Sequence, residues 1–182
     1  MEEGTKKNIK KIVLIGPEST GKTKLAKYLA KFYHTVAVPE YARGYIENLD
    51  RPYNYNDVEH IARMQVELEN KTQEKANRFL FYDTYLIITK VWFDIVYKKV
   101  PDWIEQKIKE SKIDLFLLCN NDIPWEPDPV RENGGEMREK LFDIYKNELE
   151  NYKFSYKIVE GEGKTRYKNA INAIENFFTI SK

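Results

Sequence analysis

One short segment constrains the fold of this chain more than any other: the sequence GPESTGKT at residues 16–23, which satisfies the pattern G-x-x-x-x-G-K-[ST]. It follows a β-branched apolar run at residues 11–15 and opens a helical pattern at residues 21–33. Glycines let such a loop curl until successive backbone N–H groups point at phosphate oxygens, and the following helix adds its positive N-terminal end. The segment therefore predicts a phosphate-binding loop between a buried strand and a helix.

Each residue type in this loop has a predicted task. The Lys22 ammonium would reach the β- and γ-phosphates and act in catalysis, and the Thr23 hydroxyl would ligate Mg²⁺. The predicted ATP-binding residues are Gly16, Glu18, Ser19, Thr20, Gly21, Lys22, Thr23 and Lys24. The loop thus predicts ATP and Mg²⁺ as cofactors.

The rest of the chain alternates short apolar segments with longer amphipathic ones. Further strands are predicted at residues 35–38, 78–82, 113–119 and 154–159, and further helices at residues 57–76 (with Asp57 as N-cap), 85–98, 136–151 and 164–178. Strands that alternate with helices imply parallel βαβ crossovers and a sheet covered on both faces. We therefore expect one α/β domain over residues 1–182, a three-layer P-loop NTPase fold with a five-stranded parallel sheet.

Composition and charge exclude several classes of partner. The 30 Lys and Arg residues nearly balance the 29 Asp and Glu residues, which argues against a nucleic-acid binder. The longest apolar run, residues 115–119, is far too short to cross a bilayer, and no signal peptide precedes the first strand. The single cysteine, Cys119, excludes an intramolecular disulfide. We expect a cytoplasmic protein that binds neither nucleic acid nor membrane, and the oligomeric state stays open.

Ligands of open parallel sheets bind beyond the carboxyl ends of the strands, so the residues after each strand are the next candidates. Asp83 follows the third strand, where we expect its carboxylate to hold Mg²⁺ or accept a hydroxyl proton; the alternative is a cap for the next helix. Glu40, Tyr41 and Arg43 follow the second strand. These side chains could bind a sugar hydroxyl and a planar base, or form only a surface ion pair.

Residues 121–140 predict a lid, because they contain three prolines between residues 124 and 129 and a glycine pair at residues 134–135. Arg131 and Arg138 would act in catalysis by neutralising charge on a transferring phosphoryl group, and lid closure would exclude water. Trp125 would stack on an aromatic ligand or anchor the loop. A rigid surface loop whose arginines pair with nearby acids is the alternative.

The fourth strand and the chain length narrow the class of P-loop protein. Guanine-specific GTPases carry Asn-Lys-x-Asp after a late strand, whereas here the segment Asn-Asn-Asp at residues 120–122 lacks the lysine. Motor and ring ATPases usually need longer chains with coupling segments. The 182 residues suit a phosphate-binding loop, a substrate pocket and a lid, as in nucleoside and nucleotide kinases.

Four motifs together resemble the ribosylnicotinamide kinase domain of the NadR family: GPESTGKT at residues 16–23, PEYAR at 39–43, FYDT at 81–84 and NNDIPWEPDPVR at 120–131. The resemblance extends over roughly residues 11–178, and its most specific parts are the Glu-Tyr-x-Arg element and the tryptophan in the lid. It implies ATP-dependent phosphorylation of the 5′-hydroxyl of nicotinamide riboside, a small-molecule nucleoside, to give nicotinamide mononucleotide.

The resemblance also implies roles for single residues. Glu40 and Arg43 would face the riboside beside Tyr41, Asp83 would act at the 5′-hydroxyl or on Mg²⁺, and Trp125 would stack near the nicotinamide. NadR proteins also carry an adenylyltransferase domain and sometimes a DNA-binding segment; about ten residues precede the first strand here, so we expect the kinase step alone. Another nucleoside or nucleotide kinase and an ATP-binding regulatory module remain alternatives.

Overall fold

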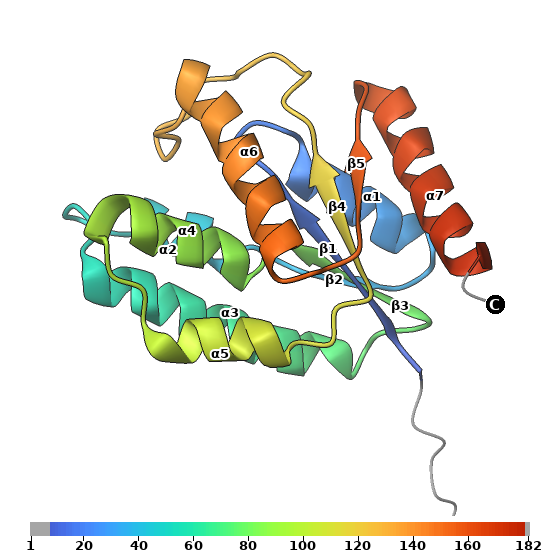
Figure 1. Ribbon diagram of the computed structural model, residues 1–182, viewed down its shortest axis with the longest axis horizontal. Helices are drawn as coiled ribbons and strands as arrows, with labels where there is room; N and C mark the ends of the chain where they lie inside the picture. Colours follow the sequence, from blue (N-terminus) through green and yellow to red (C-terminus); the bar gives the residue numbers. More distant parts are fainter. Residues whose placement is uncertain (1–7, 181–182) are drawn as a thin grey trace, which may run out of the picture.

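The protein forms a three-layer α/β fold around one parallel sheet, seen in a computed structural model that describes residues 8–180 (Figure 1). The strands are β1 (Lys10–Ile15), β2 (Val36–Val38), β3 (Phe79–Asp83), β4 (Leu115–Cys119) and β5 (Tyr156–Val159). Their order across the sheet is β2-β3-β1-β4-β5. The predicted fold class is confirmed, although the predicted domain also includes residues 1–7 and 181–182, which lie outside the described part.

Helices cover both faces of the sheet. They are α1 (Lys22–Phe32), α2 (Tyr41–Glu47), α3 (Tyr55–Gln73), α4 (Leu86–Tyr97), α5 (Asp102–Glu110), α6 (Gly135–Asn151) and α7 (Gly163–Ile180). α1 and α7 pack on one face and α3 to α6 on the other (Figure 1). Successive residues of β1 alternate between the two cores, and residues 12–15 have no exposed surface, as expected for a parallel strand buried on both sides.

The strand order determines where a ligand can bind. From β1 the chain crosses through α1 to the β3 side of the sheet, and it later returns to pair β4 with the opposite edge of β1. This change of direction makes a switch point beyond the carboxyl ends of β1 and β4. The loop at residues 16–23 lies there.

Helices α2 and α5 were not predicted from the sequence, and the N-cap of α3 differs from the one predicted. The short helix α2 has no buried residue and α5 has only Ile104 and Ile108, so neither carries a strong periodic signal. The N-cap of α3 is Asn54 rather than Asp57. Asp57 is the third helical residue and completes a capping box, because its carboxylate accepts the Asn54 N–H at 2.8 Å.

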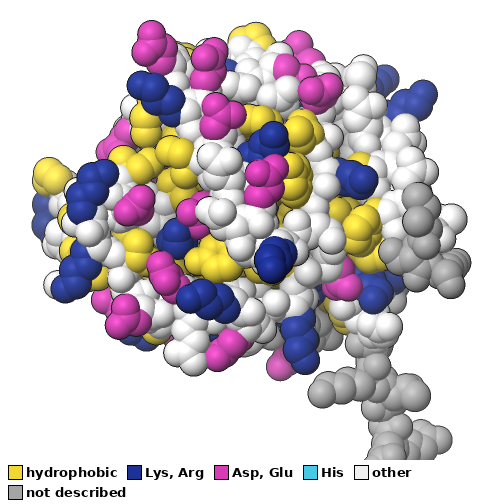
Figure 2. Space-filling view, in the orientation of Figure 1, with side chains coloured by type: hydrophobic (Ala, Val, Ile, Leu, Met, Phe, Trp, Pro, Cys, Tyr) yellow, Lys and Arg dark blue, Asp and Glu magenta, His cyan; other side chains and the backbone are white. Residues whose placement is uncertain are grey.

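The surface features agree with the balanced composition. On the face shown in Figure 2, basic and acidic side chains are interspersed, with hydrophobic side chains between them. Within residues 8–180, the structure contains no helix with the length and apolar character needed to cross a membrane.

Candidate nucleotide and acceptor site

The loop after β1 adopts the curled backbone that its glycines predict. Gly16 has φ +146°, and a Cβ there would lie 2.6 Å from the carbonyl oxygen of Cys119 at the end of β4. Ser19 and Gly21 have φ values of +56° and +74°, and Gly21 directly precedes α1. These turns place the loop around the N-terminus of α1, where backbone N–H groups lack helical partners and favour an anion.

Polar contacts inside the loop hold its lysine in place. The Lys22 ammonium donates to the Pro17 carbonyl oxygen at 2.7 Å, and the buried Thr20 hydroxyl donates to the same oxygen at 2.8 Å. The Lys22 side chain therefore folds back over the loop, on the side where phosphate oxygens would meet the backbone N–H groups.

Asp83 ends β3 beside the loop and has an unsatisfied oxygen. Its side chain is 3% exposed, and its Oδ1 has no hydrogen-bond partner among the described residues. Burial raises the pKa of the Asp83 carboxyl, while the Thr23 hydroxyl and the Lys22 charge lower this pKa. α4 begins after Tyr85 with no side-chain cap, so Asp83 does not cap that helix. A buried, unpaired carboxylate oxygen is suited to a cation or a hydroxyl proton.

The residues present fit a magnesium ion that takes most of its ligands from nucleotide phosphates and water. Within residues 8–180, no group of three or more His, Cys, Asp and Glu side chains could hold a metal ion. Thr23 and Asp83 could contribute two oxygens, and phosphate oxygens and water would supply the rest. Mg²⁺ is commonly held in this way, because it keeps several waters and binds few protein ligands.

Glu40 directly precedes α2 and brings a second carboxylate to the same region. Burial raises the pKa of the Glu40 carboxyl; the charge of Lys22 lowers this pKa and that of Asp83 raises it. These two carboxylates and the loop lysine thus share one electrostatic environment, although they come from three strand ends.

A residue that sequence reasoning missed fixes the backbone on both sides of Glu40. Gln65, buried on α3, donates from Nε2 to the Pro39 carbonyl oxygen at 3.0 Å and accepts the Tyr41 N–H on Oε1 at 2.9 Å. No local pattern distinguishes a glutamine that uses its amide in this way.

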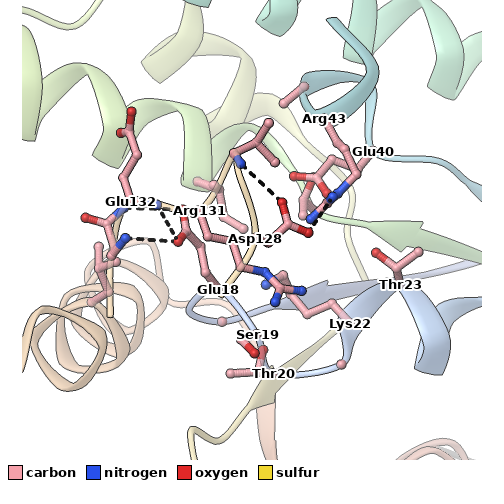
Figure 3. Close-up of a pocket in the computed structure, with 18 of the residues that line it drawn as sticks. Glu18, Ser19, Thr20, Lys22, Thr23, Glu40, Arg43, Asp128, Arg131 and Glu132 are labelled. Carbon is pink, nitrogen blue, oxygen red and sulfur yellow. Dashed lines mark hydrogen bonds and ion pairs between the residues drawn. The ribbon is translucent and has the colours of Figure 1, made fainter. Parts of the chain in front are cut away.

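A cavity of about 860 Å³ connects the loop with α2, α3, α4 and the lid (Figure 3). The predicted site residues that line it are Gly16, Glu18, Ser19, Thr20, Gly21, Lys22, Thr23, Lys24, Glu40, Arg43 and Arg131. The other predicted residues, Tyr41, Asp83, Trp125 and Arg138, do not contribute to this lining.

Tyr41 and Trp125 have other surroundings in this conformation. The Tyr41 hydroxyl lies 3.3 Å from His60 Nε2, and Tyr41 lines a smaller, separate hollow. Trp125 packs against Gly134, where an added Cβ would lie 3.2 Å from the indole, and its ring centroid lies 5.9 Å from the Arg131 guanidinium carbon. Trp125 thus anchors the lid here, which was the alternative to stacking on a ligand.

The lid is attached to the phosphate-binding loop by loop side chains. The Glu18 carboxylate accepts the backbone N–H groups of Glu132 and Asn133 at 3.1 and 3.0 Å (Figure 3). The Ser19 hydroxyl accepts the Glu126 N–H at 3.0 Å. Two residues predicted to serve ATP therefore also set the position of the lid.

Arg138 braces the loop, because each of its three guanidinium nitrogens donates to a backbone oxygen. It is buried on α6 and donates to the carbonyls of Glu18, Ser19 and Ile123 at 3.1, 2.7 and 2.8 Å. Arg131, by contrast, lines the cavity and donates to the Glu126 carbonyl oxygen. The structure therefore separates the two predicted lid arginines, and only Arg131 faces the ligand space.

Two arginines form ion pairs at the rim of the cavity. Arg43 pairs with Asp128 of the lid at 3.0 Å and with Glu47 at 3.1 Å, which ties α2 to the lid (Figure 3). Arg166, which sequence reasoning missed, is 3% exposed, lines the cavity and pairs with Asp122. Because Arg166 and the Gly161 N–H occupy the Asp122 carboxylate, Asp122 joins the ends of β4 and β5.

A phosphate-binding loop at the sheet's switch point, a carboxylate at the end of the neighbouring strand and a lid over one shared cavity define a P-loop fold of the nucleoside and nucleotide kinase type. The chain belongs to the AAA domain family, whose model matches residues 11–166.

Curated relatives share more than the loop. The chain is 26% identical over 138 residues to the trifunctional NAD biosynthesis/regulator proteins NadR of Salmonella typhimurium and Escherichia coli. The match covers 74% of this chain and 34% of each relative, so the chain spans about a third of their length. The resemblance to the NadR family that the motifs predict is confirmed.

Solved structures show the same fold. A NadR protein in complex with NR superimposes with a TM-score of 0.78 at 23% identity, over 92% of this chain and 50% of that chain. A deoxyadenosine kinase from M. mycoides superimposes with a TM-score of 0.64 at 14% identity, over 91% of this chain and 99% of that chain. At these identities the likeness concerns the fold alone.

Proposed function

We propose that this chain is an ATP-dependent kinase that phosphorylates the 5′-hydroxyl of nicotinamide riboside to give nicotinamide mononucleotide. The observation that carries the proposal is the single cavity that joins the phosphate-binding loop to a second carboxylate, Glu40. Two observations support the choice of acceptor: the 26% sequence identity to curated NadR proteins, and the likeness in fold to a NadR protein that was solved with NR.

The loop half of the cavity would take the nucleotide. Backbone N–H groups of residues 16–23 would bind the β- and γ-phosphates, and Lys22 would exchange the Pro17 oxygen for a phosphate oxygen. Thr23 and Asp83 would hold Mg²⁺, which when bound neutralises phosphate charge. The unpartnered Asp83 oxygen supports this assignment.

The other half would take the riboside. Glu40 lines the cavity whereas Asp83 does not, so we assign to Glu40 the acceptance of the 5′-hydroxyl proton. The hydroxyl oxygen would form the bond to the γ-phosphorus as the bond from that phosphorus to ADP breaks. Arg131 would neutralise charge on the phosphoryl group, and Arg138 would hold the loop in position.

The test is to incubate the chain with MgATP and separate nucleosides, among them nicotinamide riboside, deoxyadenosine and thymidine, and to weigh the products. We expect nicotinamide riboside to gain one phosphoryl group. Phosphorylation of another nucleoside in its place would refute the assignment of nicotinamide riboside as the acceptor. ATP hydrolysis that no nucleoside stimulates would favour a regulatory module.

A further inference from the structure

We propose that Tyr53 and Trp92 form the surface on which the base of the acceptor stacks, and that this surface selects a positively charged ring over a neutral one. The inference rests on the proposed kinase function for its acceptor. It adds the residues that choose the base and the chemical property by which they choose it.

The two rings form one wall of the cavity. Tyr53 lies between α2 and α3 and Trp92 lies on α4; both are partly buried, and both line the cavity that contains Lys22 and Glu40. Their ring centroids are 4.9 Å apart at an interplanar angle of 80°. Such an edge-to-face pair is a rigid platform, against which a planar base can pack at low entropic cost.

The apolar neighbours of this pair leave few polar groups that could read the edge of a base. The polar side chains that α3 and α4 contribute to the lining are Gln65 and Thr89. Gln65 already binds the backbone of Pro39 and Tyr41. These two helices therefore offer a base a stacking surface with few donors or acceptors, so recognition on this side of the cavity would depend mainly on stacking and charge.

The charges around the pair favour a cation. Among the described residues, α3, α4 and the segment between α2 and α3 contribute no Lys or Arg to the lining. The Tyr53 hydroxyl donates to the Glu132 carboxylate at 3.0 Å, which places a negative charge beside the rings. Burial, with the charge of Glu132 adding to it, raises the pKa of the Tyr53 hydroxyl, so that it remains a donor.

The other cations of the cavity are in different places or are engaged. Lys22, Lys24 and Lys27 belong to the loop and α1. Arg43 is paired with Asp128 and Glu47, and Arg166 is paired with Asp122. Arg131 donates to the Glu126 carbonyl oxygen and lies beside Trp125. A pyridinium ring against Trp92 would gain a cation–π interaction with the indole and attraction to Glu132. A neutral ring of the same shape would gain the stacking alone.

The experiment measures binding of two ligands to the full chain by calorimetry, with a non-hydrolysable ATP analogue present. One ligand is nicotinamide riboside, and the other is its neutral analogue with a ring carbon in place of the charged nitrogen. We expect the wild-type protein to bind the charged ligand about tenfold more tightly. Trp92→Leu should reduce this ratio to about twofold or less, and Glu132→Gln should lower it chiefly through weaker binding of the charged ligand.

Trp103→Leu is the matched control, because Trp103 lies on α5, donates to Glu59 and does not line the cavity. It should keep the wild-type ratio. Glu132 is exposed, so Glu132→Gln tests the charge even where Trp92→Leu disturbs folding. Equal affinities in the wild type, or a ratio that neither Trp92→Leu nor Glu132→Gln changes, would overturn the inference. If the protein binds the ATP analogue but neither binds nor phosphorylates nicotinamide riboside, the proposed function fails instead.

Discussion

Gln65 gives the most direct test of how the fold positions the acceptor carboxylate. Its amide satisfies two backbone groups that flank Glu40, the Pro39 oxygen and the Tyr41 N–H. Gln65→Met keeps the size of the side chain and removes both hydrogen bonds. A buried polar group that loses its partner costs about 1–3 kcal/mol. Two such groups lose their partner, but Pro39 is an exposed residue, so we expect a total loss of about 2–4 kcal/mol in the free energy of unfolding.

Gln65→Met should change the kinetics of the nucleoside acceptor and leave those of ATP unchanged. Without the Gln65 amide, the Glu40 backbone can shift, and small misplacements of a reacting group lower kcat by up to about 100-fold. The KM for ATP should stay unchanged, because the contacts of Lys22 and Thr20 with Pro17 do not involve α3. Gln65→Glu keeps an acceptor for the Tyr41 N–H and loses the donor to Pro39, so its defect should be intermediate.

The assay combines urea denaturation with steady-state kinetics in both substrates. Gln73→Met is the matched control, because Gln73 is an exposed residue at the end of the same helix. A Gln65→Met protein that is destabilised but turns over with normal kcat and normal KM for the nucleoside would refute the positioning role. Equal increases in the KM for ATP and the KM for the nucleoside would also refute the positioning role, since they would indicate general disorder of the cavity.

Three further predictions concern the loop, the two carboxylates and acid stability. Arg138→Met should lower the free energy of unfolding by about 3 kcal/mol and raise the KM for ATP, because three backbone carbonyls lose their donor; a purely catalytic arginine would change kcat alone. Asp83→Asn should raise the Mg²⁺ concentration for half-maximal rate, whereas Glu40→Gln should lower kcat at least about 100-fold with unchanged Mg²⁺ dependence; the reverse pattern would exchange their roles. Arg51 holds the pKa of the Asp57 carboxyl well below its usual range, so the stability from this pair is present above about pH 4 and is lost as the pH falls further. The Tm of the wild type should therefore fall more steeply below about pH 4 than that of Asp57→Asn, and parallel Tm curves would contradict this reasoning.

Sequence alone predicts those parts of the site that follow from local geometry. A strand, a glycine-bearing loop and a helix in succession define the anion site around Lys22, and parallel topology brings the residues after β2 and β3 to the same edge of the sheet. Glu40 and Asp83 could be chosen on that ground. Sequence could not tell which of the two accepts the hydroxyl proton and which holds Mg²⁺, because that depends on which carboxylate faces the cavity.

The remaining residues depend on tertiary contacts that leave no local signal. Gln65 contacts backbone atoms 24 and 26 positions away, and Arg138 binds carbonyls up to 120 positions away. From sequence, Trp125 in the lid either stacks on an aromatic ligand or anchors the loop, whereas Trp92 lies in an apolar helix that resembles ordinary core. In the structure the cavity is lined by Trp92 and not by Trp125, which anchors the lid.

The contacts between loop and lid also explain how a chain of nearly zero net charge can prepare a site for a highly charged ligand. The loop's acidic residue, Glu18, is bound by N–H groups of the lid, and the lid's Asp128 is bound by Arg43. Hydrogen bonds from uncharged N–H groups thus hold the Glu18 carboxylate on the lid, and an ion pair neutralises Asp128, while the Lys22 ammonium contacts a neutral carbonyl. A phosphate can replace that carbonyl without the cost of breaking an ion pair, so the Lys22 charge is available to an anionic ligand although the net charge of the chain is only +1.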